Sequence, residues 1–231
     1  MEIEIDKAYN CDCKELLLEM QKTGIKADWC ITDPPYGLDI GKMTFTLHKP
    51  EKSNAKAAKR DYVGVADWDS DRLTNEYFDL IFSTSTNQII FGGNYYTDIL
   101  PPTKSWLVWD KRLPHKRDRN DFADCELAWC SQGVARVFNY MYNGMLQEDK
   151  KHPDFRFHPT QKPTQLWYKL LNFYTKEGDV ILDPFGGSFS LAVACAKSNR
   201  HFITCEKDKH IFEKGQKWLN DVKSQGSIFD L

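Results

Sequence analysis

The sequence predicts a single α/β domain over residues 1–231, built on a mostly parallel, doubly wound sheet with helices on both faces. Short apolar segments alternate with helix-like ones along most of the chain, which is the order typical of βαβ units. Several apolar segments also end abruptly in acids, prolines or glycines, as parallel strands do where ligands bind at their carboxyl ends. The length suffices for one sizeable core.

The first half of the chain contains two helices, two strands and a loop. KELLLEMQKTG (14–24) clusters leucines before a glycine and predicts a helix, and ADWCIT (27–32) predicts a buried strand. Residues 38–66 are polar, basic and without periodicity, which predicts a mobile loop. DRLTNEYFDLIFSTS (71–85) predicts a helix, and NQIIFGGN (87–94) a strand closed by a pair of glycines.

The alternation of strand-like and helix-like segments resumes after a Pro-Pro pair. PPTKSWLVWDK (101–111) predicts a strand, and residues 124–133 and 134–141 favour an antiparallel pair. TQLWYKLLNFYTKEG (164–178) predicts a helix with a glycine end, and DVILDPFGGS (179–188) a short strand entering a glycine turn.

The C-terminal part completes the pattern. FSLAVACAKSNR (189–200) predicts a strongly apolar helix, HFITCEKD (201–208) a strand and KHIFEKGQKWLNDV (209–222) an amphipathic helix. Three chemistry-bearing segments therefore fall at expected strand ends, namely Asp33–Tyr36, Asp183–Ser188 and Cys205–Asp208.

Composition favours a soluble protein of the cytoplasm. Hydrophobic residues make up 41% and charged residues 28% of the chain, and no run approaches the roughly 18 apolar residues of a membrane span. The N-terminus has no basic region followed by an apolar block, so we expect neither a signal peptide nor a membrane partner. The seven cysteines lack paired C-x-x-C spacing, which predicts buried free thiols and no metal site.

Two basic clusters interrupt a chain whose net charge is −2. Residues 41–60 hold five Lys and one Arg against one Glu, and residues 111–119 hold five basic residues against one Asp. Clusters of this kind on a neutral protein favour a side that faces phosphates, although solvated loops would have the same composition.

A nucleoside-cofactor site is indicated by DPFGGS (183–188) together with Glu206. Adjacent glycines after a strand let a ligand approach the backbone, because glycine has no Cβ. About 20 residues further on, the next strand ends in Glu206, where an acid suits the two hydroxyls of a ribose. The glycine turn alone is a weak signal, and the acid at this distance strengthens it.

The segment ITDPPYG (31–37) is suited to chemistry on an exocyclic amine. Such an amine is a poor nucleophile because its lone pair is delocalised into the ring. The carboxylate of Asp33 and the carbonyl of Pro34 could both accept its N–H groups and free that lone pair. Pro34 and Pro35 form a stiff turn, and Tyr36 offers a flat face for a base flipped out of a duplex. An ordinary strand end remains the alternative for these residues.

TDPPYG, HPTQKP (158–163), DPFGGS and CEKD, in this order, resemble the signature segments of S-adenosylmethionine-dependent DNA amino-methyltransferases. The catalytic segment precedes the glycine turn by about 150 residues. This circularly permuted order resembles the β group of N6-adenine and N4-cytosine methyltransferases. The resemblance implies a Rossmann-like methyltransferase fold. FGGNYYTDILPPTKSWLVWDK and DCELAW resemble the middle of small phage and bacterial members, so the resemblance covers roughly residues 1–215.

The resemblance implies a role for each matching residue. Asp33, Pro34 and Tyr36 would hold and activate the target amine, and Pro35 would stiffen the turn. Cofactor binding is implied for Asp12, Thr160, Gln161, Lys162, Pro163, Asp183, Phe185, Gly186, Gly187, Ser188 and Glu206. Within that set, Glu206 would take the ribose hydroxyls. Asp12 matches an acid near the cofactor's adenine but could equally be a helix N-cap.

Two features depart from the family pattern. Phe189 stands where the family usually has a third glycine, so it could crowd the cofactor or simply begin the helix. The larger members also have a substantial target-recognition region, whereas here only residues 111–157, with the 38–66 loop as a second candidate, are available for it.

The predicted reaction is methylation of adenine N6 in double-stranded DNA. The preference for adenine depends on the acid in the first motif position and so on the resemblance. N4-cytosine methylation, RNA methylation and a degenerate homologue that only binds nucleic acid are the alternatives. Glutamine-amide methylation fits less well, because that class has its glycines before the catalytic motif. A second copy of the chain and a cognate restriction endonuclease are left open as partners, in a bacterial or phage-infected cell.

Overall fold

The computed structural model describes residues 1–38, 72–112, 123–143, 146–148, 154, 157–158 and 160–229. The chain divides into two units, Met1–Pro34 with Thr74–Leu231, and Pro35–Leu73. In the second unit Gly37 has a φ of 71° and lies against Arg72, whose Cβ would be 3.1 Å from a Cβ added to the glycine. Apart from Leu38, the predicted loop 38–66 lies outside the described residues.

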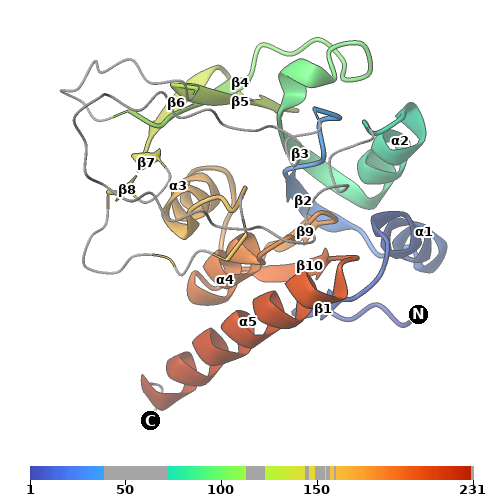
Figure 1. The fold of residues 1–231 in the computed structure, drawn as a ribbon. Coiled ribbons are helices and arrows are strands. Elements are labelled where there is room, and N and C mark those ends of the chain that lie inside the picture. The colour runs from blue at the N-terminus through green and yellow to red at the C-terminus, as the bar shows by residue number, and fades with distance from the viewer. Residues whose placement is uncertain are drawn as a thin grey trace. The chain divides into compact units, whose positions relative to one another are not determined.

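The larger unit is built on an eight-stranded sheet in the order β1-β10-β9-β2-β3-β5-β4-β6 (Figure 1). Its strands are β1 (Lys7–Tyr9), β2 (Ala27–Thr32), β3 (Ser85–Phe91), β4 (Trp106–Asp110), β5 (Cys125–Cys130), β6 (Arg136–Asn139), β9 (Val180–Asp183) and β10 (His201–Cys205). The pairs from β1 through β3 are parallel, whereas β5 is antiparallel to both of its neighbours. The prediction of a mostly parallel α/β sheet is therefore confirmed.

Helices cover both faces of this sheet, as predicted (Figure 1). They are α1 (Cys13–Thr23), α2 (Asn75–Thr84), α3 (Thr164–Tyr174), α4 (Ser190–Lys197) and α5 (Lys209–Phe229), with a 3-10 turn η2 (Gly93–Tyr95) after β3. Leucines of α1 and α2 pack with Cys30, Leu182 and Ile203 on one face. The apolar sides of α3, α4 and α5 pack on the other face, against residues such as Trp29 and Ile181. The central strands are thus buried on both faces, which explains their almost continuous apolar sequences.

The predicted antiparallel pair of 124–133 with 134–141 is wrong. β6 lies beside β4 and runs parallel to it, with Val108 opposite Val137. The reason is that β5 already has β3 on one edge and β4 on the other, so it has no free edge for a third strand. β6 instead forms the end of the sheet. Three of its four residues are exposed and the fourth is partly buried, so its burial does not alternate.

Other differences concern short elements and boundaries. β1 and the small two-stranded sheet of β7 (Tyr142–Asn143) and β8 (Leu146–Gln147) are too short to give a sequence signal. α2 begins and α3 ends about four residues inside the predicted ranges, whereas α5 continues to Phe229. β5 and β6, which fall within the predicted 111–157 insert, are strands of the main sheet.

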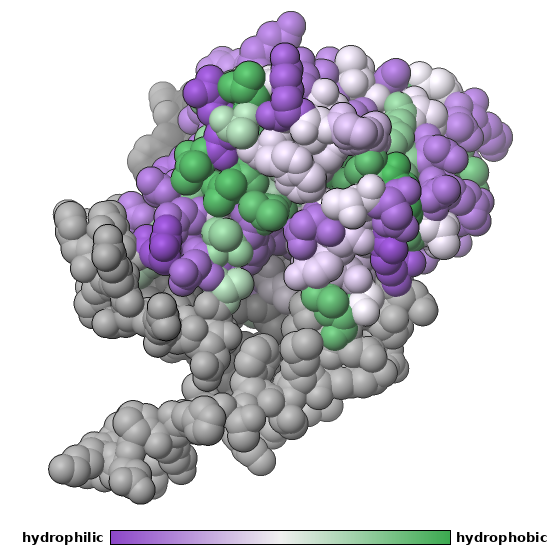
Figure 2. All heavy atoms as spheres, turned by 90° about the horizontal axis from the view of Figure 1, so that it is seen from above, coloured by the Kyte–Doolittle hydropathy of each residue, from purple (hydrophilic) through white to green (hydrophobic). Residues whose placement is uncertain are grey.

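The surface and the thiols refine the compositional predictions. The face in Figure 2 shows small hydrophobic groups set among hydrophilic residues. All seven cysteines are free, as expected, but Cys125 is exposed and Cys11 and Cys13 are only partly buried, so the prediction of buried thiols is wrong for these three. Within the described residues, no helix combines the length and apolar character needed to cross a membrane.

Candidate active site

Two of the predicted site segments begin side by side at the carboxyl edge of the sheet. β2 and β9 are adjacent parallel strands, with Cys30 opposite Leu182. Asp33 follows the last residue of β2, and Asp183 is the last residue of β9. The hydroxyl of Thr32 donates a 2.7 Å hydrogen bond to Oδ1 of Asp183, which ties the two strand ends together. Segments 150 residues apart in the sequence are thereby joined at one edge, as the fold class requires.

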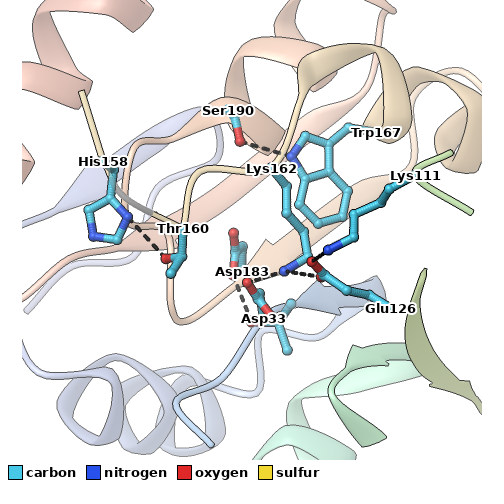
Figure 3. A network of polar contacts seen from close by, with 10 residues as sticks. Asp33, Lys111, Glu126, His158, Thr160, Lys162, Trp167, Asp183 and Ser190 are labelled. Atoms are coloured by element: carbon cyan, nitrogen blue, oxygen red, sulfur yellow. Dashed lines mark hydrogen bonds and ion pairs between the residues drawn. The ribbon is translucent and has the colours of Figure 1, made fainter. Parts of the chain in front are cut away.

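Lys162 connects Asp33 to a second carboxylate (Figure 3). Its ammonium contacts Oδ2 of Asp33 and lies 3.3 Å from Oε2 of Glu126. Glu126 in turn accepts a 3.1 Å hydrogen bond from Lys111. The four side chains therefore form a row of alternating charges, Lys111, Glu126, Lys162 and Asp33.

Burial makes this row electrostatically strong. Only 6% of the Lys162 side chain is exposed, and its Nζ lies 4.7 Å from the centre of the Phe91 ring. Burial by itself lowers the pKa of Lys162, but the carboxylates of Asp33 and Glu126 outweigh that effect and raise its pKa above the ordinary value. Burial likewise opposes ionisation of Glu126, yet Lys162 and Lys111 hold its pKa below the usual range. Lys162 and Glu126 therefore both carry their charge at neutral pH.

Asp183 has the opposite electrostatic environment. Burial raises the pKa of its carboxyl to about 7, even though Thr32 and the backbone N–H of Phe185 both donate to it. The negative charge of Asp33 raises this pKa further. At neutral pH Asp183 is thus divided between its protonated and ionised forms, while Lys162 and Glu126 stay ionised.

The glycine turn after β9 leaves room for a ligand above the backbone. A Cβ on Gly186 would lie 2.3 Å from Oγ1 of Thr204, so glycine is required there. A Cβ on Gly187, whose φ is 52°, would meet only the Phe185 carbonyl at 4.0 Å, so open space lies over this residue. Oε2 of Glu206 accepts a 3.1 Å hydrogen bond from the Gly187 N–H, which brings the acid to the turn.

The Glu206 carboxylate is fixed at the end of β10. Its other oxygen accepts a 2.8 Å bond from the backbone N–H of Asp208, and burial raises its pKa against these two donors. Each carboxylate oxygen has a second lone pair available, as recognition of neighbouring hydroxyls would need. The residues of the turn and Glu206 therefore fit a nucleoside cofactor such as S-adenosylmethionine.

Phe189 begins the helix after this turn and points into the core. It is the N-cap of α4, with a φ of 62°, and its side chain is fully buried. Its ring packs edge-on against Phe212 at 5.7 Å and lies under Gly215 of α5, where an added Cβ would come within 2.7 Å of it. Of the two alternatives for Phe189, the structure supports a core residue that begins the helix.

The remaining predicted site residues lie in several settings. Asp12 is the N-cap of α1 and accepts a 2.9 Å bond from the Lys14 N–H, so its capping role is shown. Thr160 is hydrogen-bonded to His158, and Pro163 is the N-cap of α3. Ser188 is buried at the end of the glycine turn. The buried Gln161 side chain accepts a hydrogen bond from the Phe157 N–H at 3.4 Å. Pro35 and Tyr36 begin the second unit, so their place at the site stays a prediction.

Sequence reasoning missed Thr32, Lys111 and Glu126. Lys111 was attributed to a phosphate-facing cluster, but it and its neighbour Arg112 are both paired with carboxylates. A charged residue inside the apolar strand segment CELAWC is the one signal that could have drawn attention to Glu126. Within the described residues, no group of three or more His, Cys, Asp or Glu is placed to hold a metal ion.

This fold and site define a Rossmann-like α/β protein whose glycine turn and Glu206 fit a nucleoside cofactor, with an ion-paired acid at the same edge of its sheet. Residues 93–217, more than half of the chain, match the family N6_N4_Mtase, described as DNA methylase. The chain belongs to this family. Membership confirms the predicted class, the S-adenosylmethionine-dependent DNA amino-methyltransferases.

Individual relatives agree with the family match. An 81-residue segment is 37% identical to the type II methyltransferase M.HindIII of Haemophilus influenzae, spanning 35% of this chain and 25% of that protein. M.HinfI of the same species is 23% identical over 95% of this chain and 70% of its own length. Among solved structures, the M1.HpyAVI–SAM complex has a TM-score of 0.58 at 23% identity, covering 92% of this chain and 99% of that one. The PvuII cytosine-N4-specific DNA methyltransferase has a TM-score of 0.55 at 13% identity, covering 95% and 91%.

Proposed function

We propose that the chain transfers a methyl group from S-adenosylmethionine to the exocyclic N6 amine of an adenine flipped out of double-stranded DNA. The observation that carries this proposal is the pairing of β2 with β9, which brings Asp33 beside the glycine turn. An amine acceptor and a nucleoside-cofactor site at one edge are what such a transfer needs.

The proposed cofactor contacts come from three parts of the chain. Asp183, Phe185, Gly186, Gly187 and Ser188 would line the methionine end, together with the segment Thr160–Pro163. Glu206 would accept hydrogen bonds from the ribose hydroxyls, and Asp12 would lie toward the adenine end while it caps α1. When bound, the cofactor supplies an electrophilic methyl group on a sulfonium.

Asp33 is the residue that would prepare the target amine. Its carboxylate and the Pro34 carbonyl accept N–H bonds and so concentrate the lone pair on nitrogen. The amine nitrogen would bond to the methyl carbon as that carbon leaves sulfur, sulfur would keep the electron pair, and the amine would release one proton to solvent. Lys162 holds Asp33 in place, so the acceptor needs little reorganisation. Tyr36 would stack on the flipped base.

The test is to incubate the protein with methyl-labelled S-adenosylmethionine and unmethylated plasmid DNA, digest the DNA to nucleosides and identify the labelled base. Label on N6-methyladenine is expected. Label on N4-methylcytosine would overturn adenine as the target base but would leave Asp33 as the proposed acceptor. Label only when RNA replaces DNA would overturn the substrate class, and failure to bind the cofactor would indicate a degenerate binding homologue.

The relatives bear on partners only as proposals. Type II methyltransferases such as M.HindIII and M.HinfI suggest that this chain modifies a short DNA site in a bacterial or phage-infected cell. The basic residues of 41–60 and 111–119 are proposed to contact DNA phosphates, with Lys111 excepted because it pairs with Glu126.

A further inference from the structure

Glu126 shares one ammonium with the proposed amine acceptor. Lys162 lies between the two carboxylates, in contact with Asp33 and 3.3 Å from Glu126 (Figure 3). Glu126 belongs to β5, where it pairs with Trp109 of β4, so a rigid sheet fixes its backbone. The buried Lys162 has little water to replace either partner, since only 6% of its side chain is exposed. A stronger interaction with one carboxylate must therefore weaken its interaction with the other.

Lys111 affects this balance from the far end of the row. It follows β4 directly and donates to Oε1 of Glu126 at 3.1 Å, whereas Lys162 lies near Oε2. Each oxygen of Glu126 thus has its own cation. With Lys111 present, Glu126 has less excess negative charge with which to attract Lys162 away from Asp33.

We propose that Glu126 is a positioning residue for methyl transfer. It divides the Lys162 ammonium between two carboxylates, and in this way it sets how firmly Asp33 is held and how much negative charge Asp33 presents to the target amine. Lys111 adjusts the same division through Glu126. This inference rests on the proposed function, because it takes Asp33 as the acceptor of the amine N–H.

The charges around Asp33 determine in which direction each substitution should change the ionisation of its carboxyl. The charged or titratable groups around Asp33 include Lys162 before α3, Glu126 on β5, Lys111 after β4 and Asp183 on β9. With the row ionised, two positive charges balance two negative ones. Removing the charge of Glu126 or that of Lys111 leaves the row unbalanced, and the two removals act on Asp33 in opposite directions.

Glu126→Gln should strengthen the hold of Lys162 on Asp33. The Asp33 carboxylate then stays ionised to lower pH but is a poorer acceptor, so the plateau kcat should fall about tenfold. The acid limb of the kcat profile should move to lower pH by about half a unit or more. Lys111→Met should move that limb to higher pH, and by less, because Lys111 acts through Glu126.

The experiment measures kcat against pH, the KM for cofactor and the melting temperature for the intact chain and both variants. Glu76→Gln, which breaks an exposed 2.7 Å pair between Glu76 on α2 and Lys14 on α1, is the matched control and should leave the profile unchanged. Opposite shifts of the acid limb with cofactor KM within about twofold support the proposal. Unshifted profiles, or shifts in the same direction, would overturn it even if the melting temperature falls. A wild-type chain that labels no nucleic acid would instead overturn the proposed function.

Discussion

The ammonium of Lys162 contacts the carboxylate of Asp33, although the two residues lie 129 positions apart in the chain. Asp33 directly follows β2, the strand beside β9, and Lys162 belongs to the loop before α3. Their contact joins the DPPY and HPTQKP segments through chemistry as well as through the fold. It also implies that Lys162 acts mainly by positioning Asp33 and less by binding the cofactor.

Replacing Lys162 tests this implication. Lys162→Met keeps the length of the side chain but removes the ammonium that holds Asp33 in place, so we expect kcat to fall about 100-fold while cofactor Kd rises less than about fivefold. Lys169→Met, an exposed position on α3, is the matched control and should retain activity. Steady-state kinetics and calorimetric cofactor titration measure the two quantities. A variant that loses cofactor binding but keeps kcat would show that Lys162 belongs to the cofactor site alone.

Asp33→Asn should separate chemistry from binding. The amide oxygen keeps one acceptor of similar shape but lacks the charge, so we expect kcat to fall by about 100-fold or more. Cofactor affinity should change little, because the glycine turn and Glu206 are untouched. Single-turnover methylation and cofactor titration are the measurements. The double variant Asp33→Asn/Lys162→Met should be no slower than the slower single variant, because both changes remove one interaction. Fully additive losses would argue against a shared role.

Asp183 predicts a pH dependence of stability with a definite sign. Burial raises the pKa of this carboxyl in the folded chain to about 7. Its value in the unfolded chain is near the ordinary one of about 4. The folded chain therefore retains a proton that the unfolded chain releases between these pH values. The contribution to stability is complete below about pH 4 and is lost as pH rises through about 7.

The matched variant is Asp183→Asn, whose amide oxygen can still accept from Thr32 and the Phe185 N–H. Between pH 4 and pH 8, the free energy of unfolding of the wild type should fall relative to this variant by up to about 4 kcal/mol. Denaturant titrations at several pH values measure the difference. Glu206 has the same environment in both proteins, so its own titration cancels. Parallel curves for the two proteins would contradict the assignment.

The sequence was sufficient to predict strands that a short segment of the chain identifies by itself. ADWCIT is followed by Asp33, and the apolar residues VIL (180–182) are followed by Asp183. These segments form β2 and β9, adjacent and parallel as the predicted fold requires. The prediction that β5 and β6 form an antiparallel pair failed. Closeness in the chain favours a hairpin, but the partner of a strand depends on which strand edges are already occupied.

The network at the site was harder to predict than the motifs. Lys162 and Asp33 were both recognised, but with separate roles, because nothing in either segment shows that their side chains meet. Glu126 resembles any charged residue in a strand until β4, β5 and the loop before α3 are assembled around it. Side-chain pairing over long sequence distances depends on packing, and packing is not encoded in local periodicity.

Phe189 and Gly215 show how the chain accommodates a large side chain at a position that favours glycine. Phe189 has a φ of 62°, which costs a non-glycine residue about 1 kcal/mol or more. Its fully buried ring offsets that cost. The ring fits because Gly215, inside α5, leaves the space that a Cβ would fill at 2.7 Å. The two residues should therefore be energetically coupled.

A double-mutant cycle measures that coupling. Phe189→Gly should destabilise the fold by about 2–4 kcal/mol, since loss of the ring outweighs the relief of backbone strain. Gly215→Ala should cost about 1–2 kcal/mol, because overpacking against the ring exceeds the gain in helix propensity. In the double variant the alanine methyl enters the space that the ring leaves. Its free energy of unfolding in urea should therefore exceed the additive expectation by at least about 1 kcal/mol. Strict additivity would mean that the glycine in α5 is not there to admit the ring.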